Sequence, residues 1–130
     1  PAYCMASGRA ILATRSDDEI RDILGRSNRV AYTPHTKTDI SQIMDAIYET
    51  RERGYAITEQ ETVMGDISIA APVRRPDGTC TAAINLSVST ADWEARKAAT
   101  HFSPVVMEAA RAVSGLSELR PFTFGDGAAR

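Results

Sequence analysis

The most informative pattern in the chain is an alternation of apolar and polar residues on both sides of a tight turn. Residues 66–73 lead into Arg75-Pro76-Asp77-Gly78, and residues 79–88 return from it. Pro, Asp and Gly together favour a turn, so the pattern predicts an antiparallel β-hairpin. Successive side chains of a strand point to opposite faces, which gives this hairpin one apolar and one polar face. The polar face carries small hydrogen-bonding residues: Asp66, Ser68, Thr79, Thr81, Asn85 and Ser87.

The pairing register decides which of these polar groups meet. If Arg74 lies opposite Thr79 across the turn, Ser68 faces Asn85. The same register pairs Asp66 with Ser87. Two interpretations are open: the solvent face of a one-sided antiparallel sheet, which normally alternates in this way, or the floor of a small-molecule pocket. The face lacks the Lys, Glu and Arg side chains that are typical of an exposed sheet, which favours a covered pocket.

Helical periodicity dominates the residues before the hairpin. A short helix is expected over residues 8–13, with Ser7 as its N-cap. Ser16 opens a capping box, which predicts a helix that ends near Gly25. Asp39 is the N-cap of the next predicted helix, and Gly54 ends it. A strand is then expected from residue 55 to about residue 60.

The last third of the chain is also predicted to be helical. A first helix is expected over residues 91–101. Ser103 and Pro104 are typical of an N-cap and a first helical residue, so a second helix is predicted from there to Gly115. Its buried stripe would be Val106, Ala109, Ala110 and Val113. The residues after Arg120 are expected to form a flexible tail.

These elements predict an α/β fold with a mainly antiparallel sheet flanked by helices. Residues 1–120 would form one domain and residues 121–130 the tail. About three strands are visible, fewer than small sheets usually need. The chain also opens at Pro1 without an initiating Met. Both observations lead us to expect a piece of a longer polypeptide, whose sheet lacks its N-terminal strands.

Composition narrows the function. The 130 residues are 43% hydrophobic and 25% charged, with a net charge of −2 and scattered Lys and Arg, so a surface that grips nucleic acid is not expected. No apolar run approaches the length of a membrane span, and no signal peptide opens the chain. Cys4 and Cys80 have no metal-ligand spacing, and buried free thiols are favoured over a disulfide. A cytoplasmic location is therefore expected.

Candidate chemistry is sparse. The residues from Met5 to Gly8 precede a predicted helix, whose free N–H groups and small side chains could seat a ligand carboxylate. An ordinary N-cap explains the same residues. His35 and His101 lack partners at metal or triad spacing, and Ser7 is not in a nucleophile elbow, so enzyme activity is not favoured.

Taken in order, several segments resemble the effector-binding domain of the IclR family of bacterial transcription regulators. They are Pro1–Ala13, Tyr32–Asp39, Arg53–Ala56, the glutamate-bearing stretch to Gly65, Ser68–Val73, Asp77-Gly78, Ala82–Ser87 and the closing Ala-rich helix. The opening Pro-Ala-Tyr-Cys is most similar to the subgroup that controls protocatechuate, 4-hydroxybenzoate and β-ketoadipate pathways. The resemblance extends to about Leu119.

This resemblance implies a GAF-like α/β fold and a pocket that senses a small organic or aromatic acid, without a cofactor or metal. Carried over by position, the pocket residues are Ala6, Ser7, Thr58, Ser68, Asn85 and Ser87. The backbone N–H groups of Ala6 and Ser7 are the expected seat of the carboxylate. The resemblance also implies a homo-oligomer that binds operator DNA only through an N-terminal helix-turn-helix domain, which this chain lacks.

Three functions follow from the sequence. The leading hypothesis is the ligand-sensing domain of an IclR-type regulator. The second is an assembly or interaction domain of the same fold with a vestigial pocket. The third is an unrecognised enzyme acting on a small acid, for which no activated group is visible.

Overall fold

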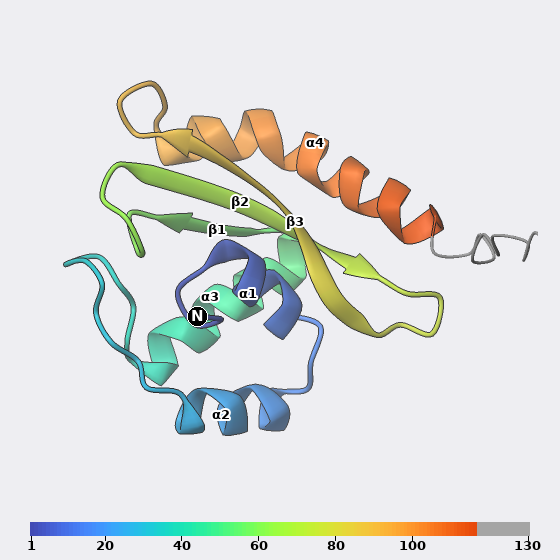
Figure 1. The fold of residues 1–130 in the computed structure, drawn as a ribbon, viewed down its shortest axis with the longest axis horizontal. Coiled ribbons are helices and arrows are strands. Elements are labelled where there is room, and N and C mark those ends of the chain that lie inside the picture. Colours follow the sequence, from blue (N-terminus) through green and yellow to red (C-terminus); the bar gives the residue numbers. More distant parts are fainter. Residues whose placement is uncertain (117–130) are drawn as a thin grey trace, which may run out of the picture.

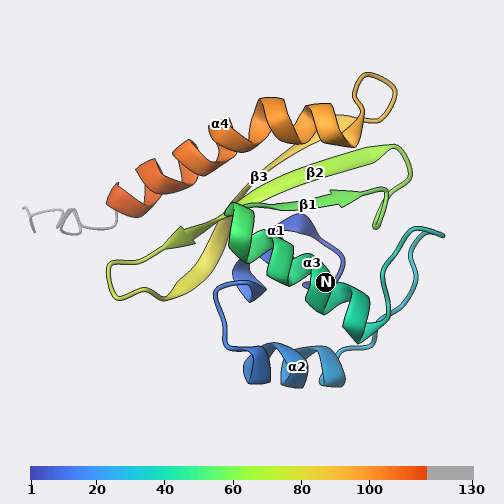
Figure 2. The same ribbon diagram turned by 180° about the vertical axis from the view of Figure 1, so that it is seen from behind.

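The computed structural model describes residues 1–116, which form four helices and a three-stranded antiparallel sheet in the order β1-β2-β3. The helices are α1 (Ala6–Leu12), α2 (Asp17–Arg26), α3 (Ile40–Arg53) and α4 (Ala95–Leu116), and the strands are β1 (Ala56–Glu59), β2 (Asp66–Arg74) and β3 (Cys80–Ser89). Helix α4 covers one face of the sheet (Figure 1), and α1 and α3 lie on the other side, with α2 farther out (Figure 2). The predicted α/β class is confirmed. The predicted tail, 121–130, lies outside the described residues.

The apolar face of the hairpin packs against α4. Ile67, Ile69 and Ala71 of β2 are buried against Ala98, Val106 and Ala110 of the helix. Val73, Ile84, Leu86 and Val88 add partly buried side chains to the same cluster. Burial of this apolar surface is the main force that holds α4 on the sheet.

A different kind of contact occupies the opposite face. A buried layer made only of small side chains lies between α1 and the sheet. It consists of Ala6 and Ala10 of α1 and Ala56 and Ala70 of the sheet. Ala83 packs beside it. We call these five residues the alanine layer. Beyond it, a second apolar core joins the helices through Ile20, Leu24, Ile43, Met44 and Ile47.

The capping predictions are confirmed for the two middle helices. The Ser16 hydroxyl accepts the Glu19 N–H at 3.3 Å, and the Asp39 carboxylate accepts the Gln42 N–H at 3.3 Å. Gly54 ends α3 in the left-handed region at φ 86°, which a residue without Cβ adopts at little cost.

Helix α2 ends at Arg26, near Gly25 as predicted. Two other helices differ from the prediction. Helix α1 begins at Ala6 with Met5 as its N-cap, so Ser7 lies inside the first turn and does not cap it. Helix α4 runs unbroken through Pro104, because residues on both sides of the proline bury into the same core while the proline itself is exposed. Val113, predicted to be buried, is 40% exposed.

The predicted hairpin register is also wrong, by two residues. Arg74 pairs with Cys80 rather than Thr79, and a bulge between Val73 and Arg74 adds a second residue of offset. Ser68 therefore faces Ser87 instead of Asn85, and Asp66 faces Ser89. Between Asp66 and Val73, the shift of two residues leaves each side chain on its predicted face, whereas beyond the bulge the shift is one residue and Cys80 lies opposite Arg74. Cys4 and Cys80 are both buried and free, as predicted.

Candidate ligand-binding site

A cavity of about 300 Å³ lies between the polar face of the sheet and the start of α1. Its lining consists of Met5, Ala6, Thr58, Thr62, Val63, Asp66, Ser68, Asn85 and Ser87. Five of the six predicted site residues are thus brought together: Ala6, Thr58, Ser68, Asn85 and Ser87. Ser7 is half-buried in α1 and is not part of the lining.

The floor of the cavity is one row of side chains that crosses all three strands. Thr58 of β1 pairs with Ser68 of β2, and Ser68 pairs with Ser87 of β3. The Ser68 and Ser87 hydroxyl oxygens are 2.7 Å apart. Directly opposed residues in a sheet share one face, so the register itself aligns these three hydroxyls.

Hydrogen bonds extend this row to its neighbours. The Ser68 hydroxyl donates to Asp66 Oδ2 at 2.7 Å, and the Asn85 Nδ2 group donates to Ser87 Oγ at 3.4 Å. These four residues therefore form a connected polar chain along the floor, with the Asp66 carboxylate at one end.

Thr58 is the exception in this polar row. Its side chain lines the cavity and the residue is only 5% exposed, yet the structure gives its hydroxyl no hydrogen-bond partner among the described residues. No buried side-chain nitrogen or oxygen atom among the described residues lacks a partner, so the Thr58 hydroxyl is accessible rather than sealed in the core. The cavity is where a partner for it would lie.

The start of α1 forms the roof. Met5 caps the helix without a side-chain hydrogen bond, and the N–H groups of Ala6 and Ser7 have no partner among residues 1–116. Met5 and Val63 are 43% and 63% exposed, so apolar side chains surround the opening.

Sequence reasoning missed four lining residues. Asp66 was placed on the polar face but was not chosen for the site, although its place in the alternation was a usable signal. Met5 lies in the turn before α1, which the sequence indicated as a candidate seat for a carboxylate, although Met5 itself was not chosen. Thr62 and Val63 belong to the β1–β2 loop, and their positions depend on how that loop folds, for which periodicity gives no signal.

A buried ion pair fixes that loop beside α1. Both guanidinium NH groups of Arg9 reach the Glu61 carboxylate at 2.6 Å, and each side chain is 1% exposed. The backbone N–H of Lys37 adds a bond to Glu61 at 3.0 Å, and Arg9 Nε donates to the Tyr3 carbonyl at 2.9 Å. Because Glu61 precedes two cavity residues, Thr62 and Val63, this pair also holds one side of the cavity.

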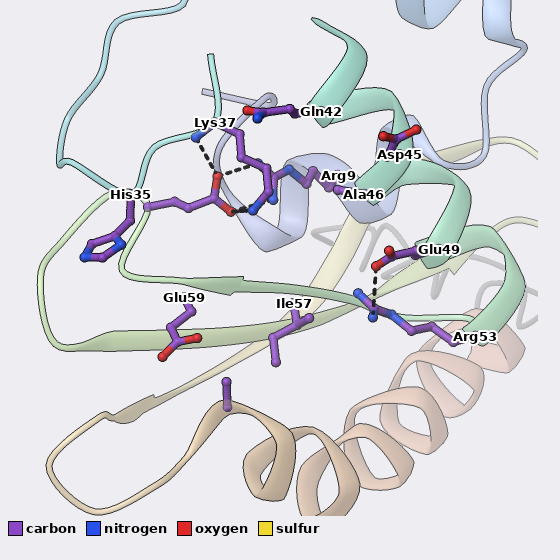
Figure 3. A pocket seen from close by; sticks show the side chains of 12 residues that line it. Arg9, His35, Lys37, Gln42, Asp45, Ala46, Glu49, Arg53, Ile57 and Glu59 are labelled. Carbon is purple, nitrogen blue, oxygen red and sulfur yellow. Dashed lines mark hydrogen bonds and ion pairs between the residues drawn. The ribbon is translucent and has the colours of Figure 1, made fainter. Parts of the chain in front are cut away.

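A larger groove of about 600 Å³ lies on the other side of Arg9 and Glu61, between α3 and β1 (Figure 3). Its lining is mainly charged, and several of these groups already pair with one another. Lys37 lies 3.6 Å from Glu61, and Arg53 lies 3.7 Å from Glu49. Gln42 and Asp45 extend from α3 along it, and His35 lies at one end. Because the chain satisfies many of its own charges here, we place the candidate ligand site in the smaller cavity.

The two histidines have no catalytic setting. His35 lies in the groove, and the His101 ring packs 5.2 Å from Trp93 and 4.7 Å from Phe102. Residues 1–116 contain no group of three or more side chains suited to hold a metal ion. Among the described helices, none combines the length and apolarity that crossing a bilayer requires.

Comparison with known proteins decides the family. The family model of the bacterial transcriptional regulator IclR C-terminal domain matches residues 1–115. The chain belongs to this family. The predicted membership is therefore confirmed, and the IclR C-terminal domain is the effector-binding part of these transcriptional regulators.

Individual IclR-family proteins give the same result. The chain is 32% identical over 111 residues to the Pca regulon regulatory protein of Pseudomonas putida, covering 85% of this chain and 38% of that protein. A transcriptional regulator from Rhodococcus sp. RHA1 has 30% identity and a TM-score of 0.83, covering 90% of this chain and 48% of its own. A double mutant of the PobR inducer-binding domain from Acinetobacter, in complex with 3-hydroxybenzoic acid, shares the fold with a TM-score of 0.81, at 22% identity over 89% of this chain and 66% of its own. The chain thus spans under half the length of the first two relatives.

Proposed function

We propose that this IclR-family domain senses a small organic or aromatic acid in the cavity between α1 and the polar face of the sheet. One observation carries the proposal: Thr58 lines the cavity, and its hydroxyl has no hydrogen-bond partner among the described residues. The ligand residues are then Ala6, Thr58, Ser68, Asn85 and Ser87, with Ser7 contributing its backbone N–H. PobR, which shares this fold, is known in complex with an aromatic acid.

The chemistry of the roof supports an acid. No Lys, Arg or His is among the nine lining residues, so a carboxylate needs another source of positive potential. The unpaired N–H groups of Ala6 and Ser7 at the start of α1 supply donors of the required kind. In this proposal the site binds and releases its ligand unchanged, without a cofactor or metal.

Regulation in this proposal comes from differential affinity. A ligand changes DNA binding only if it binds two arrangements of the regulator unequally. We propose that the arrangements belong to a homo-oligomer in the bacterial cytoplasm. Operator DNA would be held by a helix-turn-helix domain outside the residues of this chain.

A second candidate is an assembly domain with a vestigial cavity. One observation favours it: β3 pairs only with β2 among the described residues, which leaves the other edge of a ten-residue strand open. In that case no small acid stabilises the domain.

A thermal-shift screen of aromatic, keto and short dicarboxylic acids tests the proposal. A ligand at 100 times its Kd should stabilise the fold by about 2.7 kcal/mol, which is an easily measured increase in Tm. The replacements Ser68→Phe and Asn85→Phe should abolish the shift by filling the cavity. Thr81→Phe, on the same hairpin but outside the cavity, is the matched control. Binding that survives both cavity replacements would refute this site, and a screen without any shift favours assembly.

A further inference from the structure

The floor of the cavity has a direction that limits what can bind there. A serine hydroxyl has one hydrogen to donate. Ser68 gives its hydrogen to Asp66 Oδ2, so in the 2.7 Å contact with Ser87 it can only accept. Ser87 therefore donates to Ser68 and accepts from Asn85. The hydroxyl hydrogens of Ser68 and Ser87 thus both point toward the Asp66 carboxylate.

At the Asp66 end of the row, the polar atom left for a ligand is an acceptor. Asp66 Oδ1 has no hydrogen-bond partner among the described residues, whereas the hydrogens of Ser68 and Ser87 are already used. Asn85, which keeps its Oδ1 and one Nδ2 hydrogen, lies at the other end of the row. A ligand group that also only accepts, such as a carboxylate, would find repulsion here. A hydroxyl or ammonium group would find a charged acceptor.

The electrostatic setting points the same way. Asp66 is the single charged residue among the nine that line the cavity, and it is half-buried. Charge–charge repulsion is felt more strongly in a partly enclosed site than in water. A second carboxylate on the ligand would lie near this charge with no cation in the lining to offset it.

We propose that the Asp66 end of the cavity selects ligands that carry a hydroxyl or ammonium donor and rejects those that carry a second carboxylate there. This inference rests on the proposed sensing function at the same cavity. Thr58 completes the selection from the neighbouring strand. Its free hydroxyl can donate to the oxygen of a ligand hydroxyl whose own hydrogen goes to Asp66. The ligand class is therefore a hydroxylated or aminated monocarboxylic acid.

Isothermal titration calorimetry with matched compounds tests this. One series is 3-hydroxybenzoate, benzoate and benzene-1,3-dicarboxylate; an aliphatic series is 4-hydroxybutanoate, butanoate and butanedioate. In the series that fits the cavity, the hydroxylated member should bind about tenfold or more tightly than the other two. Equal affinities within a series that binds would overturn the inference.

Variants assign the effect to Asp66. Asp66→Asn keeps the shape and still accepts the Ser68 hydrogen, so the preference for hydroxyl over carboxylate should fall about tenfold. Asp45→Asn removes one exposed charge outside the cavity and should leave the preference unchanged. Thr58→Val, which removes a single hydroxyl, should weaken the hydroxylated members more than the unsubstituted ones, with an unchanged Tm. An unaltered preference in Asp66→Asn would contradict the proposal.

One more compound separates the inference from the function on which it rests. The neutral 3-hydroxybenzamide keeps the hydroxyl and lacks the acid. If it binds in an Asp66-dependent way while no acid binds, acid sensing is wrong and the selection by Asp66 stands. If the acids bind without regard to hydroxylation, acid sensing stands and the selection is wrong. If no compound of either series binds, both are overturned.

Discussion

Arg9 and Glu61 form the most enclosed charged pair among the described residues, and their geometry explains how the fold tolerates them. The guanidinium and the carboxylate are joined by two parallel hydrogen bonds. The Tyr3 carbonyl accepts a further hydrogen bond from Arg9, and the Lys37 N–H donates one to Glu61. Burying such charges costs free energy, which a fully bonded pair recovers only in part. The pair therefore fixes the place of the β1–β2 loop rather than adding much to stability.

Removing one partner should be costly. Arg9→Met would leave the Glu61 carboxylate enclosed with only Lys37 near it, and we expect a loss of about 3–5 kcal/mol in the free energy of unfolding. Urea denaturation measures it. The double replacement Arg9→Met with Glu61→Met should lose less than Arg9→Met alone, because no unpaired charge is buried. A loss below about 1 kcal/mol in the single variant would contradict this account.

At this scale, sequence reasoning could predict most of the cavity and none of the ion pair. Ser68, Asn85 and Ser87 follow from alternation, which survives an error in register of two residues. Thr58 followed from the family resemblance, and Ala6 from the predicted helix start together with that resemblance. Arg9 and Glu61 are 52 residues apart, and no periodicity connects them, so only the folded chain shows that they meet.

At the scale of elements, α1 approaches its surroundings unusually closely. A Cβ on Gly8 would lie 2.4 Å from the Ala2 Cα and 2.7 Å from the Ala2 carbonyl oxygen. Both are backbone atoms, which cannot move aside as the end of a flexible side chain can. Any larger residue at this position would clash with the Ala2 backbone, so only glycine fits.

A matched pair of glycine replacements tests this. Gly8→Ala should destabilise the fold by about 1–3 kcal/mol, because the segment before α1 must move. Gly25→Ala, in α2 with open space around it, should stabilise the fold by about 0.5–1 kcal/mol, because alanine favours the helix. Chemical denaturation of both variants measures the two changes in the free energy of unfolding. If both replacements changed the free energy of unfolding in the same direction, the close approach of Ala2 would not limit position 8.

The contact between α2 and α3 should depend on pH. Hydrogen bonds from Arg51 at 2.6 Å and from Tyr48 at 2.9 Å lower the pKa of Asp17 below its usual 3.8. A carboxyl whose pKa is lower in the folded state stabilises the fold above its unfolded pKa, and that contribution is lost as pH falls through the folded value.

Wild type should therefore lose more stability than Asp17→Asn when pH falls from about 6 to about 3, as measured by Tm. Asp18→Asn, on the exposed side of the same turn, is the control and should follow wild type. Parallel curves for wild type and Asp17→Asn would exclude this contribution.

The elements themselves were largely predictable, and the failures share a cause. Ser16, Asp39 and Gly54 act locally, and their predicted roles are confirmed. The predicted break at Pro104 is wrong because tertiary packing of α4 on the sheet outweighs the local preference of proline. Local signals thus fixed where helices start, and packing decided whether they continue.

At the scale of the whole molecule, the open edge of β3 is the feature most able to govern behaviour in solution. Unpaired N–H and C=O groups along an edge strand favour pairing with another chain. We expect this chain to associate as its concentration rises, as measured by sedimentation. Ala82→Lys, at an exposed position of β3, should reduce association, whereas Ala112→Lys on α4 should not. Equal effects of the two would indicate general charge repulsion instead.

The alanine layer has a consequence for how this domain could change over time. It sets the distance between α1 and the sheet, and most of its members never touch the cavity. One added or removed methyl group at Ala10 or Ala70 would therefore alter the height of the binding space while leaving its hydroxyls and carboxylate untouched. Under the proposed sensing function, the size of the recognised molecule can drift separately from its chemical character, so relatives with the same polar row need not share a ligand.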